Sequence, residues 1–411
     1  MYSRKRIRNF NINKLIAMRQ LILFCCCLTA VTTFAQQSLY KQLQTKLIEA
    51  NNGDTIRLPE GTFSMPGSLS MEGKNDIVIL GAGMDKTILS FKDQATGAEG
   101  IKISNGRHIK LVDFTVQDAK GDCIKVQQVN GLVFKNIKAE WTGKPSSKNG
   151  GYALYPVQCQ NVLIDGCWAI GASDAGIYVG QSKNIIVRNS KAYHNVAGIE
   201  IENSSYADVY DNEAWENTGG ILVFDLPDLP VKLGTQSRVF RNNIHDNNHI
   251  NFAPKGNIVA KVPLGTGMLL LASQQSEIFE NKITNNRTLG ISVVSYFMSE
   301  NPIKDSLYDP YPHDAYIHDN TMTRKRQRAT GKGRIGKMYR FKLKFGKDVP
   351  HIMYDGIVDE KNQDKAICLY NNHEETFANI DAGNGFKNKN RNVKPYQCKG
   401  KSYEPVKLEW E

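Results

Sequence analysis

The sequence predicts an all-β chain that folds as a right-handed, single-stranded parallel β-helix, a solenoid in which every coil adds one strand to each face. Two observations predict this fold. Similar segments recur in coils of 22–39 residues. Each recurrence holds strands of four to six residues between Asn and Gly turns, with almost no helical periodicity between them. Coils of this kind stack about 4.8 Å apart and bury continuous apolar columns.

The recurring segment ends in Asn or Gly. It reads GLVFKN, NVLIDG, NIIVRN, ADVYDN, SRVFRN, SEIFEN and AYIHDN, and its last residues are Asn136, Gly166, Asn189, Asn212, Asn242, Asn281 and Asn320. Glycine opens another strand in most coils, at Gly176, Gly198, Gly220, Gly267 and Gly290. A further Asn follows the segment by five or six residues, at Asn195, Asn217, Asn247 and Asn286. We expect these asparagines to bond from coil to coil as a structural ladder.

The alignment of these segments predicts three columns along the solenoid. Its third position gives an inward apolar column of Val133, Leu163, Ile186, Val209, Val239, Ile278 and Ile317. Its fifth position alternates in sign over the first six coils and predicts a structural charge ladder of Lys135, Asp165, Arg188, Asp211, Arg241, Glu280 and Asp319. Its fourth position gives an outward aromatic stripe of Tyr210, Phe240 and Phe279, which we expect the C-terminal segment to cover.

The N-terminus indicates export. Residues 1–35 form a predicted signal peptide, with an apolar run from Leu21 to Phe34 and cleavage after Ala35. A start at Met18 would give a more ordinary leader. The apolar run is shorter than a membrane span requires, so we expect no stable membrane insertion. Of the five cysteines that remain, we expect buried thiols and a Cys368–Cys398 bridge.

Helical spacing and charge set the expected domain plan. An apolar stripe of Leu39, Leu43 and Leu47 predicts a short helix that caps the first coil of a β-helix over residues 36–323. Residues 324–411 are expected to form a basic extension that packs on the β-helix. The net charge is +11, yet residues 36–323 hold 26 Lys/Arg against 30 Asp/Glu. The basic ends therefore give no reason to expect that the core binds nucleic acid.

The opening of the β-helix resembles a known superfamily. A helix followed by GDTIRLPEGTF and then by NDIVILGAG, residues 75–83, resembles the start of pectate-lyase-superfamily β-helix proteins. Residues 350–382 also resemble exported bacterial parallel β-helix repeat proteins, a group without an assigned biochemical function. The resemblance implies the fold, an exported location and a sheet face that carries catalysis in polysaccharide lyases, epimerases and hydrolases.

Coil lengths predict where a site lies. Four long loops, over residues 142–151, 225–236, 249–265 and 296–314, flank the strands that glycine opens, so we expect a groove over this sheet. Outward residues on its floor are Lys125, Tyr155, Tyr178 and Phe224, which suit the hydroxyls and ring faces of a sugar chain. Glu200 and Glu202 point to the same side, and they predict paired-acid chemistry or, with Asp174 nearby, a calcium site.

A second set of candidates ends the longest loop. His313 and Asp314 follow Pro312, and a Pro-His-Asp string is similar to part of the catalytic motif of alginate epimerases. The resemblance implies that His313 is an acid/base group. The sequence departs from that motif at Tyr311, where the family has an aspartate, and this departure weakens the assignment.

Three classes of function remain open on the sequence. The first is a carbohydrate-active protein, with an acidic polysaccharide as partner and a lyase, uronate epimerase or glycoside hydrolase activity. The second is a non-catalytic binding or assembly module that works with an exported partner protein. The third is a metal-processing β-helix protein, although the scattered His and Met residues form no cluster and predict no metal ligand. No cofactor is indicated, apart from calcium as a candidate ion.

Overall fold

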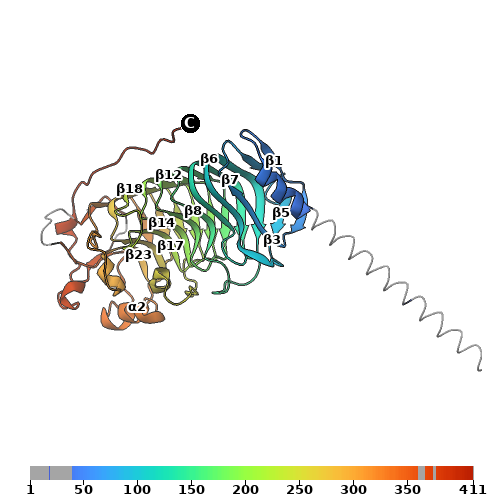
Figure 1. Ribbon diagram of the computed structural model, residues 1–411. Coiled ribbons are helices and arrows are strands. Elements are labelled where there is room, and N and C mark those ends of the chain that lie inside the picture. The colour runs from blue at the N-terminus through green and yellow to red at the C-terminus, as the bar shows by residue number, and fades with distance from the viewer. Residues whose placement is uncertain (1–17, 19–38, 360–365, 374–375, 411) are drawn as a thin grey trace, which may run out of the picture.

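The computed structural model describes residues 18, 39–359, 366–373 and 376–410. The predicted signal peptide therefore lies outside the described residues, apart from Met18. A helix over residues 39–49 covers one end of the body, with Leu43 and Leu47 buried against the first coils (Figure 1). The predicted capping helix is confirmed. Within the described residues, no helix has the length and hydrophobicity that crossing a membrane requires.

The body is an all-parallel β-solenoid with three faces (Figure 1). The first face carries β3 (Gly67–Glu72), β8 (Tyr152–Val157), β11 (Ala175–Gly180), β14 (Ala197–Glu202), β17 (Gly219–Phe224), β20 (Thr266–Leu271), β23 (Leu289–Val294), β26 (Ile352–Tyr354) and β28 (Phe377–Asn379). The second carries β1 (Thr55–Arg57), β4 (Val78–Leu80), β9 (Gln160–Asp165), β12 (Lys183–Arg188), β15 (Ser205–Tyr210), β18 (Thr235–Phe240), β21 (Gln274–Phe279), β24 (Ala315–His318) and β27 (Ile367–Tyr370).

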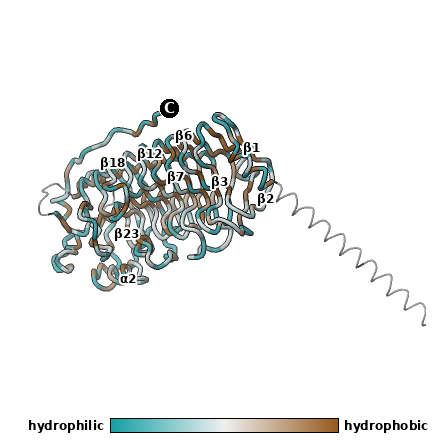
Figure 2. The backbone as a smooth tube through the Cα atoms, viewed as in Figure 1, coloured by the Kyte–Doolittle hydropathy of each residue, from teal (hydrophilic) through white to brown (hydrophobic). Residues whose placement is uncertain are grey.

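The third face consists of shorter strands. It carries β2 (Gly61–Ser64), β5 (Thr87–Ser90), β10 (Trp168–Ile170), β13 (Lys191–Tyr193), β16 (Glu213–Trp215), β19 (Asn243–His245), β22 (Lys282–Thr284) and β25 (Thr321–Thr323). Two long strands, β6 (Thr96–Gln117) and β7 (Ile124–Glu140), run through all three faces. The predicted fold class is confirmed, and Figure 2 shows hydrophobic backbone segments recurring from coil to coil.

The inward column of the second face differs from the prediction by one residue in its first three coils. Ile186 pairs with Asp208, whereas Val187 pairs with Val209 and lies in the main core. The inward column is therefore Phe134, Ile164, Val187, Val209, Val239, Ile278 and Ile317. The predicted members Val133, Leu163 and Ile186 face outward, where Leu408 of the C-terminal tail covers them. The error arose because the landmark Asn189 is itself the left-handed turn residue, a position that Asp211 takes in the next coil.

Two buried asparagine ladders join the coils. Asn217 donates from Nδ2 to Asn247 Oδ1 at 3.0 Å and accepts at Oδ1 from the backbone N–H of Asn195 at 2.9 Å. The first ladder consists of Asn195, Asn217, Asn247 and Asn286, and the second consists of Asn212, Asn242, Asn281, Asn320 and Asn372. The prediction that these asparagines are structural is confirmed, since each satisfies buried backbone groups of its neighbours.

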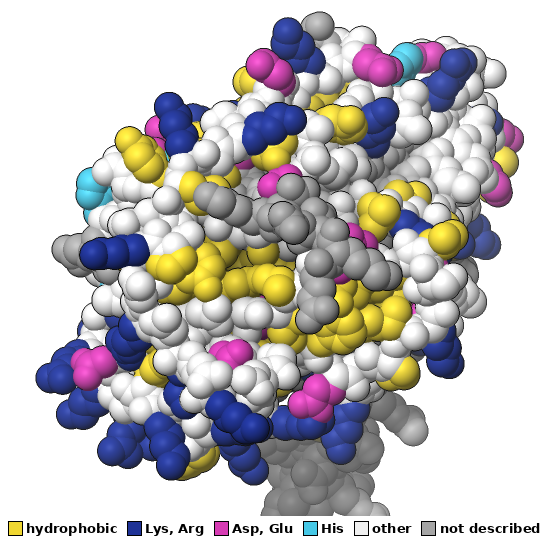
Figure 3. All heavy atoms as spheres, turned by 90° about the vertical axis from the view of Figure 1, so that its left-hand side faces the viewer, with side chains coloured by type: hydrophobic (Ala, Val, Ile, Leu, Met, Phe, Trp, Pro, Cys, Tyr) yellow, Lys and Arg dark blue, Asp and Glu magenta, His cyan; other side chains and the backbone are white. Residues whose placement is uncertain are grey.

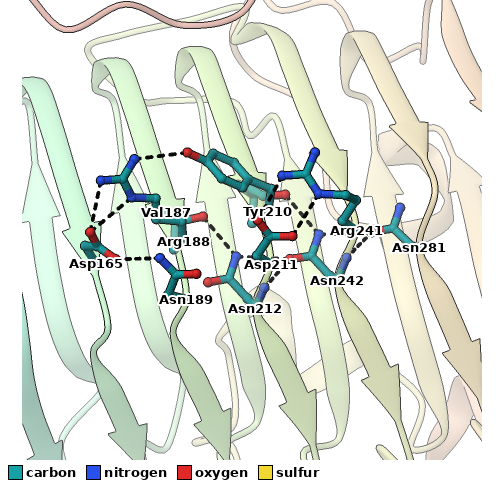
Figure 4. A network of polar contacts seen from close by, with 11 residues as sticks. Asp165, Val187, Arg188, Asn189, Tyr210, Asp211, Asn212, Arg241, Asn242 and Asn281 are labelled. Carbon is teal, nitrogen blue, oxygen red and sulfur yellow. Dashed lines mark hydrogen bonds and ion pairs between the residues drawn. The ribbon is translucent and has the colours of Figure 1, made fainter.

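The predicted charge ladder exists as two separate pairs. Asp165 pairs with Arg188 at 3.0 Å, and Asp211 pairs with Arg241 at 2.8 Å (Figure 4). Arg188 donates to the hydroxyl of Tyr210 at 3.2 Å rather than to Asp211, because the one-residue offset puts these two residues in different columns. The continuous ladder was therefore a wrong prediction, while the structural role of these charges stands.

The aromatic stripe and the tail meet on the second face. Tyr210, Phe240 and Phe279 form the predicted column on adjacent coils, and their rings stack with centroids 4.9 and 4.7 Å apart. The tail lies over the neighbouring column, where the backbone N–H of Val406 donates to Asp208 at 3.1 Å. Tyr210 packs at the edge of the cluster that the tail forms, so the cover over the stripe is partial.

The cysteines lie as predicted. Cys368 of β27 is bonded to Cys398, and this disulfide ties the tail to the last coils. Cys123, Cys159 and Cys167 are buried free thiols. Burial raises the pKa of the Cys159 and Cys167 thiols to about 12, so both are protonated and unreactive at neutral pH.

Candidate active site on the first face

The first face holds six of the eight predicted site residues, and four of them share one outward column. Lys125 of β7 pairs with Tyr155 of β8, and Tyr178 of β11 pairs with Glu200 of β14. The Tyr155 and Tyr178 rings lie 5.0 Å apart. Four coils thus place lysine, two tyrosines and glutamate in one row, because alternate residues of stacked parallel strands share a face.

The long loops do not wall an open groove over this row; they close on it. Glu200 is 1% exposed and Phe224 is 2% exposed. Val259 and Val262 of the loop over residues 249–265 pack with Leu222 and Phe224 in a second apolar core. The expectation of an open groove at Glu200 and of a sugar stacking on Phe224 is therefore corrected. The physical reason is that loop and sheet both carry apolar side chains here, whose burial is favourable.

Hydrogen bonds and an ion pair hold the loops closed. Asn257 Nδ2 donates to Asp174 Oδ2 at 2.7 Å, and the Tyr308 hydroxyl donates to the carbonyl of Asp225 at 2.6 Å. Lys232 forms an ion pair with Asp305 of the loop over residues 296–314. Three of the four predicted loops are thereby tied to the sheet or to each other.

Three acids are gathered under this cover. Burial raises the pKa of Asp174 and of Glu202 to about 7, and it raises the pKa of Glu200 well above its ordinary value. The charge of Asp174 pushes the pKa of both glutamates further up. The Tyr178 hydroxyl donates to Glu202 Oε1 at 2.6 Å, while Glu200 Oε2 has no hydrogen-bond partner among the described residues. A carboxyl group in that position is stable when protonated.

The cluster reaches solvent at its N-terminal side. Asp122, Lys125 and Tyr155 are partly exposed. The Lys125 ammonium lies 4.8 Å from the Tyr155 ring centroid. Burial raises the pKa of Asp122 to about 6 and that of Tyr155 to about 12. At neutral pH, this edge therefore presents a carboxylate that can accept a proton, a phenol that can donate one, and a cation.

An open cleft lies over the coils that precede this edge. Its volume is about 680 Å³, and it lies on the same face, beside the helix over residues 39–49. Its lining comprises Gln44, Ile48, Ser70, Met71, Glu72, Lys74, Lys102, Ser104, Asn105, Gln127 and Gln128. Ser70 pairs with Lys102, and Lys102 pairs with Lys125, so the floor of the cleft is the same column that continues into Tyr155.

The sequence missed several of these residues. Asp122 stands just before a strand of the first face, where the alternation of inward and outward residues does not yet apply, whereas Asp174, in the same place before β11, was named from the sequence as a neighbour of Glu200 and Glu202. Lys102 lies in a coil that precedes the aligned repeats. A signal that could have found Asp122 is its place directly before the strand that carries Lys125.

His313 and Asp314 lie on a different face. His313 precedes β24 of the second face, where its Nε2 lies 3.0 Å from Asp309 Oδ2, and this hydrogen bond raises the pKa of His313. Asp314 is exposed in a left-handed turn, with φ 51°. The structure therefore does not put this pair on the sheet that carries Glu200 and Glu202. Among the described residues, no group of three His, Cys, Asp or Glu side chains is arranged so that it could hold a metal ion.

Comparisons with known proteins concern the fold. The family described as "Right handed beta helix region" matches residues 99–304, about half of the chain. The A-module of the mannuronan C-5 epimerase AlgE4 from Azotobacter vinelandii is similar, with 16% identity, 78% of this chain and 86% of that chain covered, and a TM-score of 0.49. Pectate lyase Pel9A is similar with 13% identity, 68% and 69% coverage and a TM-score of 0.38. No curated protein sequence matches the chain.

Proposed function

The chain belongs to the right-handed β-helix family, and from this premise we propose that it binds and processes an acidic polysaccharide along its first face. The observation that carries the proposal is a cleft lined by Lys74 and Lys102, whose floor column continues on the next coils through Lys125 to Tyr155. Lys74, Lys102 and Lys125 would pair with sugar carboxylates, and the polar side chains of Ser70 and its neighbours would bond to hydroxyls.

The edge formed by Asp122, Lys125 and Tyr155 suits removal of a proton next to a carboxylate. Lys125 would neutralise the carboxylate of one sugar unit. Asp122, with a pKa of about 6, would take the proton from the adjacent carbon. Tyr155 would return a proton, either to that carbon, which inverts it, or to the leaving glycosidic oxygen, which breaks the chain and leaves a double bond. Epimerisation and β-elimination thus share one set of groups.

The buried acids have a supporting role in this proposal. Glu200, Glu202 and Asp174 lie behind Tyr178 and Tyr152 and do not line the cleft. Tyr152 and Tyr178 have ring centroids 4.5 Å apart, and Tyr152 also lies 4.4 Å from Tyr155. The three rings therefore form a wall that positions Tyr155, and the acids hold this wall through the Tyr178–Glu202 hydrogen bond.

The test is a panel of alginate, pectin, glycosaminoglycans and neutral glycans, assayed with the mature chain from residue 36. Ultraviolet absorbance detects elimination, reducing ends detect hydrolysis, and NMR detects epimerisation. We expect activity on an acidic glycan that Asp122→Asn and Tyr155→Phe abolish and that Glu280→Gln, an exposed acid outside the cleft, leaves unchanged. Activity confined to neutral glycans, or full activity in Asp122→Asn, would refute the proposal.

A binding module without turnover is the second candidate, because the loops close over the three innermost acids. In that case, Lys102→Gln and Lys125→Gln would weaken binding to an acidic glycan, and no product would form in any of the three assays.

We also propose export, in agreement with the predicted leader. The Cys368–Cys398 bridge supports it, because disulfides persist mainly outside the reducing cytosol. Mass spectrometry of the protein from the exporting cell would detect an N-terminus at residue 36, and an intact leader on all of the protein would contradict cleavage.

A further inference from the structure

A densely basic segment lies outside the site described above. Residues 324–347 hold eleven Lys and Arg residues and no acid. They include helix α2 (Gly333–Lys337) and the helical turn η3 (Met338–Lys342). Tyr339 and Leu343 anchor this segment in a third apolar core, so that Lys337, Phe341 and Lys344 face solvent.

Two hollows adjoin each other at α2. One has a volume of about 390 Å³ and is lined by the cations Lys255, Lys261, Lys332 and Arg334, with Glu300 as its acid. The other has a volume of about 620 Å³ and is lined by Phe297, Met298, Ile335, Met338 and Phe386, among others. Glu300, Arg334 and Ile335 line both hollows. A polar basic pocket is thus continuous with an apolar groove.

The basic hollow carries more positive than negative charge. Glu300 pairs with Arg334, whereas Lys255 and Lys332 form no ion pair within the described residues. Lys261 donates to the Ser299 carbonyl and to Asn301, both neutral acceptors. Burial and the charge of Arg334 lower the pKa of Lys261. An anionic group in this hollow would relieve that repulsion.

Large apolar side chains stand exposed around the two hollows. Phe341 is 61% exposed, Ile250 is 53% exposed, and Phe297 is 43% exposed. Phe341 stands between Arg340 and Lys342, both basic. Figure 3, which views this end of the molecule, shows Lys and Arg side chains gathered along the lower rim, the side on which α2 lies in Figure 1. Cations interleaved with single exposed aromatics are typical of surfaces that lie in a lipid interface.

We propose that this surface, formed by the two hollows and Phe341, docks on a membrane that carries phosphate-bearing anionic lipids. A headgroup phosphate occupies the basic hollow, and Phe341 and Phe297 enter the interface beside it. The charge complementarity favours this occupant over a protein partner, since five cations, Lys255, Lys261, Lys332, Arg334 and Lys342, line the two hollows against the single acid Glu300, and this excess suits a diffuse anionic surface better than a patterned one. The docking is peripheral and independent of the polysaccharide site.

The test uses the mature chain from residue 36, because the apolar run of the leader would itself bind lipid. Sedimentation with vesicles of phosphatidylcholine alone is compared with sedimentation after phosphatidylglycerol has been added to the lipid. We expect binding only to the anionic vesicles. The double variant K332Q/R334Q should weaken this binding by about tenfold or more. Phe341→Ser should also weaken it, and the matched pair K92Q/K120Q, exposed lysines in other coils, should not.

Several outcomes would overturn the proposal. These are equal binding to both kinds of vesicle, an equal loss in the K92Q/K120Q control, and no binding to either kind. If alginate or inorganic phosphate raises the Tm of the wild type but not of K332Q/R334Q, while anionic vesicles do not sediment the protein, the hollow binds an anion of another kind and membrane docking is wrong. Thermal unfolding of each variant checks that the surface, and not the fold, has been changed.

Discussion

Replacing Glu202 by Gln should stabilise the protein at high pH and leave its stability almost unchanged at low pH. Burial raises the pKa of Glu202 from 4.5 to about 7. The folded chain therefore holds a proton that the unfolded chain has already lost between these pH values, and the unfolding free energy falls as pH rises through that window. A shift of about 2.5 units corresponds to about 3 kcal/mol.

Glutamine removes this pH dependence without removing the local contact. Its Oε1 can still accept the Tyr178 hydrogen bond, and it does not titrate. Urea unfolding at pH 4 and at pH 8 should therefore show the variant gaining about 3 kcal/mol on the wild type between the two conditions. Glu280→Gln, at an exposed position, serves as the control. If the difference between variant and wild type is the same at both pH values, Glu202 is ionised in the folded protein and the account of the acid cluster is wrong.

Three further predictions concern the scaffold. Asn217→Ala should lower the unfolding free energy in urea by about 2–4 kcal/mol, because it leaves buried groups of both neighbouring coils without partners, and a change under 1 kcal/mol would contradict the structural role of the ladder. Arg238→Met should cost about 3–5 kcal/mol by the same measurement, since it removes the counter-ion of the buried Asp208 and one of the two that Glu277 has; an unchanged midpoint would show that His318 and the hydrogen bonds from the tail suffice to hold these acids. Opening the Cys368–Cys398 bridge, which closes a loop of 30 residues, should lower stability by about 3–4 kcal/mol in a thermal scan with reductant, and a Tm that does not move would show that the last coils are held without it.

The solenoid could be predicted because its coils repeat one local pattern, whereas the register between coils could not. Alternation along a strand separates its two sides, so Glu200 and Glu202 were correctly placed on one side, with Ile199 and Ile201 of the other side in the core. Register depends on which residue adopts the left-handed turn. Asn189 does so in one coil and Asp211 in the next, with Asn212 then free to join the ladder. Asn is favoured both in the left-handed turn and in the buried ladder, so the sequence alone does not show which of the two positions a given Asn occupies.

The candidate site was predictable in position but not in its exposure. Rows of residues such as Lys125, Tyr155 and Tyr178 follow from the repeat. Whether a loop stands beside such a row or lies across it depends on contacts between distant segments, for example the one from Asn257 to Asp174. Such contacts do not recur at a regular spacing, so no repeat in the sequence indicates them. The same reason explains why Glu200 was expected at the surface and is found buried.

The asparagine ladder allows the solenoid to accommodate coils of different length between one ladder asparagine and the next. Asn195 and Asn217 are 22 residues apart, and Asn247 and Asn286 are 39 apart, yet the side-chain bonds that join them are both 3.1 Å long. Seventeen more residues have thus been accommodated without any change in the rung itself. The loops that leave and re-enter the stack between these asparagines can therefore differ in length without disturbing the ladder. Exchange of the segment over residues 249–265 for a shorter one should therefore reshape the first face while the solenoid beneath it keeps its form.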